Sequence, residues 1–346
     1  MSRKSKVTSV DVARLAGVSQ SAVSRAFSRQ PTQSGVSEKT KQKIFKAAQE
    51  LGYKPNAFAR SLITQRSNIV ALLFSYLDNQ FYALALEKLC VELQKQGFHA
   101  LVFMMPSTDE GVEETVSELL EYQVDGIITA SVELSSNLCE FCRDQGIPVV
   151  MFNRFQDQDG MASVTTDNVS GGRLAARHLI ETGHERIAMI SGWQRSSTSR
   201  DRQFGFEAEL RDQGVPLFAH EIGHFNLART REAALAMFGG AEVGRPDGVF
   251  VLNDYMAFEV MSALRTTLGL RIPEDVSVIG FDDVPMAGMP EFALTTIRQP
   301  LAQMVANTTR MMVEAIRDRE AEAENIAFAP KLVQRETVQA RIAEPS

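Results

Sequence analysis

The stretch from residue 8 to residue 27 places apolar residues at helical spacing on both sides of Gly17. This pattern predicts two short helices joined by a tight turn. Gly17 occupies the turn, where a residue without a β-carbon can adopt a positive φ without steric cost. Ser19 follows at the expected N-cap of the second helix, where its hydroxyl can accept a hydrogen bond from a free backbone amide. These features predict a helix-turn-helix.

A third helix is expected to complete this unit. Ser37 is its candidate N-cap and begins a run with apolar residues at helical spacing. The residues predicted to face the core are Ile44, Phe45, Ala48 and Leu51. Residues 1–55 are therefore predicted to form an all-α helix-turn-helix domain.

The outward face of the second predicted helix carries Gln20, Ser21, Ser24 and Arg25. Gln and Arg can make bidentate hydrogen bonds to base edges in the major groove of DNA. An ordinary helical hairpin with a solvated polar face is the alternative. Charge favours DNA, because residues 1–66 hold 13 Lys and Arg against 3 acidic residues, whereas the remaining chain holds 23 against 40. A basic head on an acidic body is typical of a protein that binds a polyanion.

Several short motifs in this region resemble the lac repressor-type (LacI/GalR) family of bacterial transcription regulators. They are VDVA at 10–13, AGVS at 16–19, VSR at 23–25, VS at 36–37 and LGYKPN at 51–56. The resemblance implies a hinge helix and linker over residues 56–67, which orders on operator DNA, where two such helices from a dimer enter the minor groove. It assigns Leu62 as the side chain that wedges into a base step, with Ala59 allowing close approach and Arg60 reaching phosphate.

The motif and the resemblance together define an expected set of DNA-contacting residues. They are Thr8, Ser19, Gln20, Ser21, Ser24, Arg25, Ser37, Tyr53, Asn56, Ala59, Arg60 and Leu62. One departure from the family pattern lies between Phe27 and Val36, where the loop is about three residues longer than usual. It places the loop's expected backbone contacts in question and leaves the helix-turn-helix motif intact.

Length and composition bound the rest of the chain. Its 346 residues, 44% of them hydrophobic, suffice for a small head and about two larger units. No apolar run approaches the roughly 18 residues of a membrane span, and the N-terminus is basic and polar, so we expect a cytoplasmic protein with no membrane partner. Three cysteines, Cys90, Cys139 and Cys142, agree with a reducing compartment. The closely spaced pair Cys139 and Cys142 is expected to pack in a core rather than to bind metal.

From residue 68 onward, short apolar runs alternate with amphipathic stretches. Strands are predicted at 69–74, 100–104, 126–129, 149–152, 187–190, 248–252 and 276–280. Helices are predicted at 82–96, 112–122, 137–145, 171–181, 202–213, 230–238 and 256–268. This alternation predicts an α/β body with two open parallel sheets and a ligand cleft at the carboxyl ends of their strands.

Resemblance to the family continues through the body, in VTTDN at 164–168, VIGFDD at 278–283 and LTTIRQP at 294–300. It implies a periplasmic-binding-protein-like, effector-binding and dimerisation domain over residues 68–346. The N-lobe is expected over about 68–165 and 297–322. The C-lobe is expected over about 166–296 and 323–340.

Polar residues at predicted strand ends and nearby aromatic residues are the candidates for the effector cleft. They are Phe81, Tyr82, Asn153, Arg154, Trp193, Arg202, Phe225, Asn253, Asp254 and Asp282. Amide, guanidinium and carboxylate groups can satisfy a polyhydroxylated ligand, and aromatic rings can stack on it. The resemblance implies effector contacts for Arg202, Asn253 and Asp282. It implies a lining role for Phe81, Tyr82, Asn153 and Phe225.

Structural alternatives exist for several charged residues near the cleft. Asp254 and Asp283 suit helix capping or a salt link between the lobes as well as ligand contact. The stretch 195–202 carries three arginines beside hydroxyls before a predicted helix, a composition that could hold an acidic sugar or a phosphate. For Arg195 and Arg200, solvated loop charge is the favoured interpretation.

Other reactive side chains have simpler explanations. Trp193 could stack on a sugar or merely cover the rim of the cleft. His178 and His184 are expected to cap or pack rather than to ligate metal. No nucleophile-base set and no phosphate-binding glycine loop is visible in the sequence, so we predict no catalytic residue, no metal and no cofactor.

The sequence therefore predicts a homodimeric, sequence-specific DNA-binding transcription regulator, most often a repressor in the family. Its affinity for a pseudo-palindromic operator would be set by a small effector, for which the resemblance implies a sugar or sugar derivative. Both induction and corepression stay open. The alternative is a sugar-binding receptor or sugar-processing enzyme with a non-specific basic N-terminal arm. Residues 331–346 lack leucine heptads, which favours a dimer over a tetramer.

Overall fold

The computed structural model divides into two compact units, Met1–Ser67 and Asn68–Ser346. The structure describes residues 7–27, 35–54, 66–105, 119, 121–130, 136–155, 161–240, 244–318 and 321–341. The expected hinge residues Asn56, Ala59, Arg60 and Leu62 lie outside these ranges. So do most of the loop after Phe27 and most of the helix expected at 112–122.

The described part of the first unit folds into three helices, α1 (Ser9–Ala16), α2 (Gln20–Ala26) and α3 (Glu38–Leu51). Its core side chains are Val12, Ala13, Val23, Ala26, Ile44, Ala47 and Ala48. Phe45 was predicted to face the core of this unit. That prediction is wrong, because 44% of the residue is exposed. Its ring lies edge-on against Phe27 at 5.1 Å, outside the core, and the small side chain of Ala47 takes a core position instead.

Each helix of this unit begins at a hydroxyl N-cap. Thr8, Ser19 and Ser37 each accept a hydrogen bond from an amide in the first turn of α1, α2 and α3. At α1 the cap is reciprocal, since the Asp11 carboxylate accepts from the Thr8 amide at 2.9 Å. Gly17 ends α1 with a φ of 68°, the left-handed conformation that the turn requires.

The described residues of the second unit form two six-stranded sheets, with strand orders β11-β5-β4-β3-β1-β2 and β12-β10-β9-β8-β6-β7. The strands of the first sheet are β1 (Ile69–Phe74), β2 (His99–Met104), β3 (Gly126–Thr129), β4 (Val149–Phe152), β5 (Ala162–Thr166) and β11 (Asn325–Phe328). Those of the second are β6 (Ile187–Ser191), β7 (Ala219–Ile222), β8 (Gly248–Val251), β9 (Ser277–Asp282), β10 (Thr295–Arg298) and β12 (Lys331–Val333). The strands pair in parallel, except that β12 runs antiparallel to β10.

Helices cover both faces of the first sheet, which forms the N-lobe. On one face lie α5 (Gln80–Lys95) and α12 (Leu301–Arg317), and on the other lies α7 (Ser136–Asp144). Side chains of β1 alternate between the two, with Leu72 packing in the cluster of α5 and α12 and Leu73 packing with Cys142 of α7. The side chain of Cys139 lies outside the described residues.

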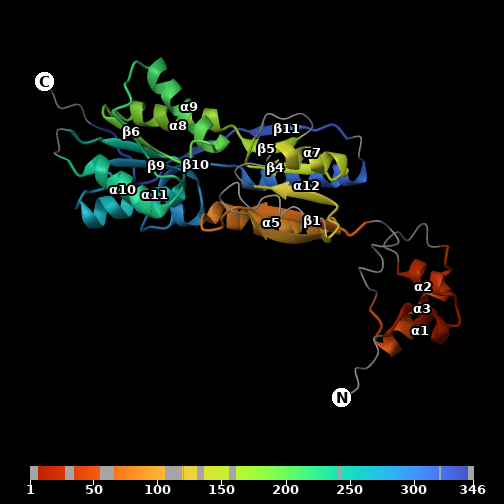
Figure 1. The fold of residues 1–346 in the computed structure, drawn as a ribbon. Helices are drawn as coiled ribbons and strands as arrows, with labels where there is room; N and C mark the ends of the chain where they lie inside the picture. The colour runs from red at the N-terminus through yellow and green to blue at the C-terminus, as the bar shows by residue number, and fades with distance from the viewer. Residues whose placement is uncertain are drawn as a thin grey trace. The chain divides into compact units, whose positions relative to one another are not determined.

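The second sheet, which forms the C-lobe, is likewise a middle layer (Figure 1). On one side lie α8 (Asn168–Glu181) and α9 (Ser197–Asp212), and on the other lie α10 (Leu227–Phe238) and α11 (Asp254–Ser262). A π-helical turn, η3 (Ala263–Thr267), continues α11, and a 3-10 turn, η4 (Pro285–Gly288), follows β9. The α/β body with two parallel-dominated lobes agrees with the fold class predicted from the sequence.

The chain passes between the lobes after β5, between β10 and α12, and between β11 and β12. The last passage comes later than the boundary expected near residue 322, because Asn325–Phe328 pairs in parallel with β5 of the N-lobe. The segment of the C-lobe near the C-terminus therefore begins at β12.

The start of α9 also differs from the expectation, which placed the first helical residue at Arg202. The helix begins at Ser197, so the stretch 195–202 is mostly its first turns rather than a loop. The reason is that Ser197, Thr198 and Ser199 are buried in the C-lobe, where their contacts outweigh the low helix propensity of hydroxyl residues. In the part of the chain that the structure describes, no helix is long and apolar enough to cross a membrane.

Candidate DNA-recognition surface and effector cleft

The residues expected to contact base edges share the exposed face of α2. Gln20, Ser21, Ser24 and Arg25 are all exposed. Gln20 Nε2 donates to Ser9 Oγ at 3.2 Å, and Arg25 Nε donates to the carbonyl oxygen of Ser21 at 3.3 Å. These contacts restrict the amide and guanidinium groups, so that less rotamer entropy is lost when this face meets a partner.

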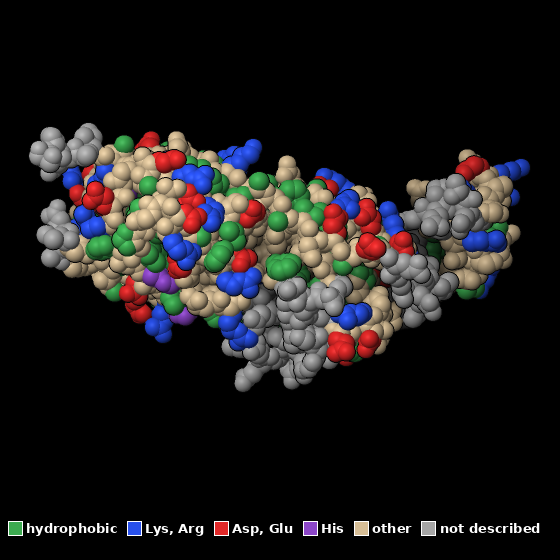
Figure 2. Space-filling model, turned by 90° about the horizontal axis from the view of Figure 1, so that it is seen from above, with side chains coloured by type: hydrophobic (Ala, Val, Ile, Leu, Met, Phe, Trp, Pro, Cys, Tyr) green, Lys and Arg blue, Asp and Glu red, His purple; other side chains and the backbone are tan. Residues whose placement is uncertain are grey.

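The other expected DNA contacts in this unit have structural partners as well. Thr8, Ser19 and Ser37 are exposed N-caps, and helix N-termini carry partial positive charge that suits phosphate oxygens. Tyr53 is half-buried, with its ring 5.8 Å from that of Phe27 in an edge arrangement. Over the body, Lys and Arg side chains are interspersed with Asp and Glu on the face shown in Figure 2.

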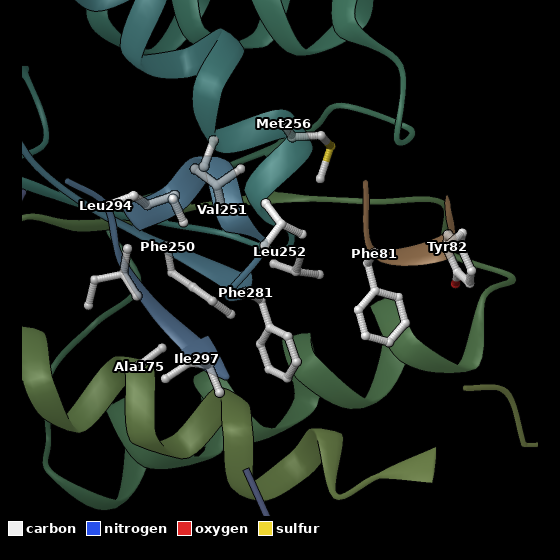
Figure 3. Close-up of a cluster of buried hydrophobic side chains, with 14 of the residues drawn as sticks. Phe81, Tyr82, Ala175, Phe250, Val251, Leu252, Met256, Phe281, Leu294 and Ile297 are labelled. Atoms are coloured by element: carbon white, nitrogen blue, oxygen red, sulfur yellow. The ribbon is translucent and has the colours of Figure 1, made fainter. Parts of the chain in front are cut away.

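A small cavity lies between the two lobes, at the carboxyl ends of their strands. Its N-lobe lining is Tyr76, Asn79, Phe81, Tyr82 and Asn153, and its C-lobe lining is Thr198, Arg202, Phe225, Asn253 and Asp282. The volume of about 10 Å³ leaves room for roughly one water molecule, so the lobes are closed on each other. The apolar wall of Phe81 and Tyr82 continues into the buried cluster that contains Leu252 and Phe281 (Figure 3).

Asp282 is the centre of the polar network in this cavity. Its carboxylate accepts hydrogen bonds from Asn79 Nδ2 at 3.2 Å and Gln299 Nε2 at 2.7 Å. Arg202 Nη1 lies 3.6 Å from its Oδ1. Burial raises the pKa of Asp282, although the Arg202 charge acts in the opposite direction. The residue also has a φ of 124°, a conformation that is strained for a side chain with a β-carbon and is typical of functional sites.

Arg202 is fixed in the C-lobe wall, with 3% of the residue exposed. Its Nε donates to Asn168 Oδ1 at 2.9 Å, and its Nη1 donates to the carbonyl oxygen of Leu252 at 2.6 Å. Its Cζ lies 3.6 Å from the ring centroid of Phe281. Burial lowers the pKa of Arg202, but a guanidinium remains charged in proteins. The cavity therefore contains a pre-oriented cation.

Arg154 follows β4 and is buried just behind the cavity wall, with 1% exposed. Its Nη1 donates to Thr198 Oγ1 across the cleft at 2.5 Å, and its Cζ lies 5.7 Å from the Tyr82 ring centroid. Its Nε and Nη2 have no hydrogen-bond partner within the described residues. The neighbouring Asn153 donates to the Tyr82 hydroxyl at 3.1 Å, while its buried Oδ1 is also without a partner there. Unsatisfied buried polar atoms are rare and mark places where a ligand can supply the missing partner.

Two of the expected cleft residues contribute mainly to the C-lobe framework. Asn253 lines the cavity, but its Oδ1 caps α11 by accepting from the Met256 amide at 2.9 Å. Asp254 is fully buried behind the lining, where it accepts from Thr296 Oγ1 at 2.6 Å and from the Val284 amide at 3.0 Å. Burial raises the pKa of Asp254 well above its ordinary value, and the charge of Asp282 adds to this effect.

The remaining candidates lie away from the lining. Asp283 forms salt bridges with Arg298 and Arg335, all three within the C-lobe, so it does not link the lobes. Trp193 is half-buried outside the set of lining residues, with the Arg195 Cζ 5.9 Å from its ring centroid. Seven of the ten expected cleft residues thus line one cavity, and Arg154, Asp254 and Trp193 do not.

Three lining residues were not among the expected ones, namely Tyr76, Asn79 and Thr198. Tyr76 and Asn79 follow β1 directly, so the rule that ligands bind beyond the carboxyl ends of strands points to them. Thr198 was not predicted to line the cleft, because residues 195–202 were expected to form a loop rather than the start of a helix. Within the described ranges, no group of three or more His, Cys, Asp or Glu residues is arranged to hold a metal ion.

Comparison with known proteins identifies both units. Residues 9–56 match the model for bacterial regulatory proteins of the lacI family, and residues 176–338 match that for a periplasmic binding protein-like domain. The chain is 32% identical over 331 residues to the HTH-type transcriptional repressor PurR of Vibrio vulnificus (strain CMCP6), covering 95% of this chain and 97% of that protein. The chain belongs to the lacI family. The HTH-type transcriptional regulator DegA of Bacillus subtilis (strain 168) is also 32% identical, over 336 residues, covering 95% of this chain and 97% of that protein.

Solved structures of transcription regulators share this fold. The lac repressor dimer bound to operator and the anti-inducer ONPF superposes with a TM-score of 0.84 at 28% identity, covering 97% of this chain and 100% of that one. The complex of the transcriptional regulator CelR with cellobiose superposes with a TM-score of 0.70 at 29% identity, covering 96% and 100%. The predicted family and fold class are confirmed. The chain is a DNA-binding transcription regulator with an effector-binding body, and its relatives are regulators rather than enzymes.

Proposed function

We propose that this chain is a homodimeric repressor that reads a pseudo-palindromic operator in the cytoplasm, without enzymatic activity, and that a small effector in the cleft sets its operator affinity. The observation that carries this proposal is the cavity between the lobes. Amide, guanidinium, carboxylate and aromatic groups from both lobes converge on it in a chain that also carries a basic helix-turn-helix. Such a mixture suits a polyhydroxylated ligand, a sugar or sugar derivative.

Hydrogen bonds across the closed cleft supply the coupling between effector and operator. Asn79 and Asp282 join one side of the cavity, and Arg154 and Thr198 join the other. An effector that enters the cavity must displace or rearrange these contacts, because the existing space holds only about one water molecule. Any effector with different affinities for the two lobe arrangements shifts the equilibrium between them, and operator and effector then alter each other's affinity reciprocally.

A surface of the N-lobe supports the dimer. β2 is an edge strand of its sheet, and Val102 and Met104 on it are 42% and 51% exposed. Val91 on the adjacent α5 is 44% exposed. Exposed apolar side chains on an open sheet edge are typical of a surface that another subunit covers.

The test is selection of bound sequences from a random duplex pool with the full-length protein at near-physiological salt, which suppresses simple phosphate attraction. Enrichment of a pseudo-palindrome is expected, because two identical heads read two half-sites. A small-molecule screen for release or tightening on that duplex then identifies the effector and its sign. Lack of enrichment in the presence and absence of candidate effectors, or turnover of a bound sugar, would contradict the proposal.

A further inference from the structure

The first turn of α9 faces the cavity without a side-chain cap. Ser196 occupies the N-cap position, but its hydroxyl makes no capping hydrogen bond and instead pairs with Thr198 Oγ1 at 2.9 Å. The first amides of a helix have no acceptor within the helix, and they carry the positive end of the helix dipole. Thr198, one residue into this 16-residue helix, lines the cavity itself. An uncapped helix N-terminus is therefore directed at the proposed effector site.

An independent feature points to the same place. Arg154 reaches the first turn of α9 from the opposite lobe and contacts Thr198 through Nη1 alone. Its Nε and Nη2 are buried without a hydrogen-bond acceptor in the described part of the chain. The Tyr82 ring centroid lies 5.7 Å from Cζ, and the side chain of Tyr76 is a second aromatic neighbour that favours the charged guanidinium. Two parallel donors of one guanidinium form the fork that binds a carboxylate or a phosphate.

The charges around the cavity also favour an anion. Arg154 and Arg202 are two buried cations, and Asp282 is the one carboxylate among the described lining residues. Asp254, which is buried behind the lining, is held toward its neutral form, because burial raises its pKa. A neighbouring cavity of about 210 Å³ is lined by Asp167 and Asp201, so an anion is disfavoured there. Two buried cations thus stand against one carboxylate around the interlobe cavity, which leaves one positive charge in excess.

We propose that the effector carries an anionic group, a carboxylate or a phosphate ester, that binds between Arg154 and the first turn of α9. This rests on the proposed function, in that the interlobe cavity is taken as the effector site. The anion accepts from Nε and Nη2 of Arg154 and from the uncapped amides of α9. Since Arg154 belongs to the N-lobe and α9 to the C-lobe, the anion bridges the lobes and replaces the hydrogen bond from Arg154 to Thr198.

The test measures thermal stabilisation of the full-length protein by simple anions at constant ionic strength. Inorganic phosphate and acetate are compared with chloride, and glucose serves as the neutral probe. The comparison uses the unchanged chain, Arg154→Met, Arg154→Lys and the control Arg200→Met. Arg200 lies on α9, but it is exposed, and its Nε is 2.8 Å from the Asp201 carboxylate.

We expect phosphate or acetate to raise the Tm of the unchanged chain and of Arg200→Met. We expect the apparent affinity to fall at least tenfold in Arg154→Met. If Arg154→Lys is still stabilised by phosphate, the effector's group is a phosphate, because a point charge is sufficient to bind it. If stabilisation by acetate requires the intact guanidinium of Arg154, the group is a carboxylate. Without anion, Arg154→Met is expected to be at least as stable as the unchanged chain, since it removes a buried charge with unsatisfied donors.

Three results would overturn the proposal. They are equal anion stabilisation of the unchanged chain and Arg154→Met, stabilisation by no anion, and stabilisation by glucose alone. If Arg154→Met does not fold, Arg154→Lys and the unchanged chain still decide between binding and no binding. Operator selection is run without these anions, so failure of the repressor assignment is seen separately from failure of the anion site.

Discussion

Asn79 Nδ2 lies 3.2 Å from Asp282 Oδ2, joining two residues 203 positions apart in the sequence across the interlobe cleft. Asn79 precedes α5 in the N-lobe, and Asp282 ends β9 in the C-lobe. The same carboxylate is 3.6 Å from Arg202. One acidic side chain thus compensates a buried cation within its own lobe and contributes to closure against the other lobe.

Replacing Asp282 is therefore expected to affect stability strongly. Asp282→Ala leaves Arg202 buried without its nearest counter-charge and Gln299 Nε2 without its acceptor. We expect the free energy of unfolding of the body to fall by about 3–5 kcal/mol, the usual cost of breaking a buried ion pair from one side. Urea denaturation followed by circular dichroism measures this loss.

The comparison for Asp282 is a more exposed ion pair in the same lobe, in which 70% of the Arg271 side chain and 28% of the Asp275 side chain are exposed. Asp275→Ala removes the partner of the exposed Arg271 and should cost much less, because water replaces the lost contact. The double variant Arg202→Met with Asp282→Ala should lose less than the two single changes added together. Simple additivity would show that the two charges do not interact.

Asp254 provides a prediction about pH. Burial raises its folded-state pKa above the ordinary 3.8, so the folded state binds this proton more tightly than the unfolded state. The stabilising contribution is fully present below pH 3.8 and is lost as pH rises through the folded-state pKa. Asp254→Asn cannot ionise, yet it can still accept from the Val284 amide and donate to Thr296 Oγ1.

The free energy of unfolding of the unchanged chain should accordingly fall relative to that of Asp254→Asn as the pH rises above 3.8, the ordinary pKa of this carboxyl group. Urea denaturation at each pH provides the two curves. Parallel curves over this range would mean that the pKa of Asp254 is the same in the folded and unfolded states.

Most of the body strands predicted from sequence are buried on both faces. The exceptions are β2, which was predicted although it has exposed positions, and β5, which is buried but was not predicted. β1, β3 and β4 begin and end where their apolar runs do, because every side chain in them meets a covering layer. β7, β11 and β12 are short strands with exposed positions and have no such run. α12 was not among the predicted helices, although it carries apolar residues at helical spacing, including Met304, Val305, Met311 and Met312.

The sequence could predict which residues meet in the cleft, but it could not predict the contacts that they make with one another. Parallel strands bring their carboxyl ends to one edge, and this rule accounts for Asn153, Asn253 and Asp282 meeting in one cavity. The burial of Arg154 depends on Thr198 in the other lobe, and no local pattern reports that contact. The role of Asp254 depends in the same way on Thr296, which lies on a strand formed much later in the chain.

Gly172 connects the packing of two helices to the position of Arg202. A β-carbon at residue 172 would lie 2.1 Å from the Arg202 carbonyl oxygen and 2.7 Å from the Phe206 amide nitrogen. Gly172→Ala must therefore push α9 away from α8, and we expect a loss of about 1–3 kcal/mol in the free energy of unfolding. The control Gly240→Ala adds a methyl group with no neighbouring heavy atom within 4 Å. Equal melting temperatures for the two variants would exclude this steric link.

Arg25 tests how the helix-turn-helix reads DNA. Its guanidinium is anchored by the hydrogen bond from Nε to the Ser21 carbonyl, which leaves a defined group on the exposed face of α2. If Arg25 contacts a base edge, Arg25→Ala should lose about 1–3 kcal/mol of discrimination at one operator position and little elsewhere. Binding to a set of duplexes with every single-base change in the selected operator measures this profile.

Arg14 on α1 is the matched control for Arg25, since it is an exposed arginine of the same unit with Asp11 as its ion-pair partner. Arg14→Ala should weaken all duplexes by a similar factor if the residue reaches phosphate, and it should leave the order of base preferences unchanged. A uniform loss for Arg25→Ala, together with a salt dependence reduced by about one phosphate contact, would instead assign Arg25 to the DNA backbone. Base recognition would then rest on the shorter side chains of α2, with Gln20 as the remaining residue able to make a bidentate contact.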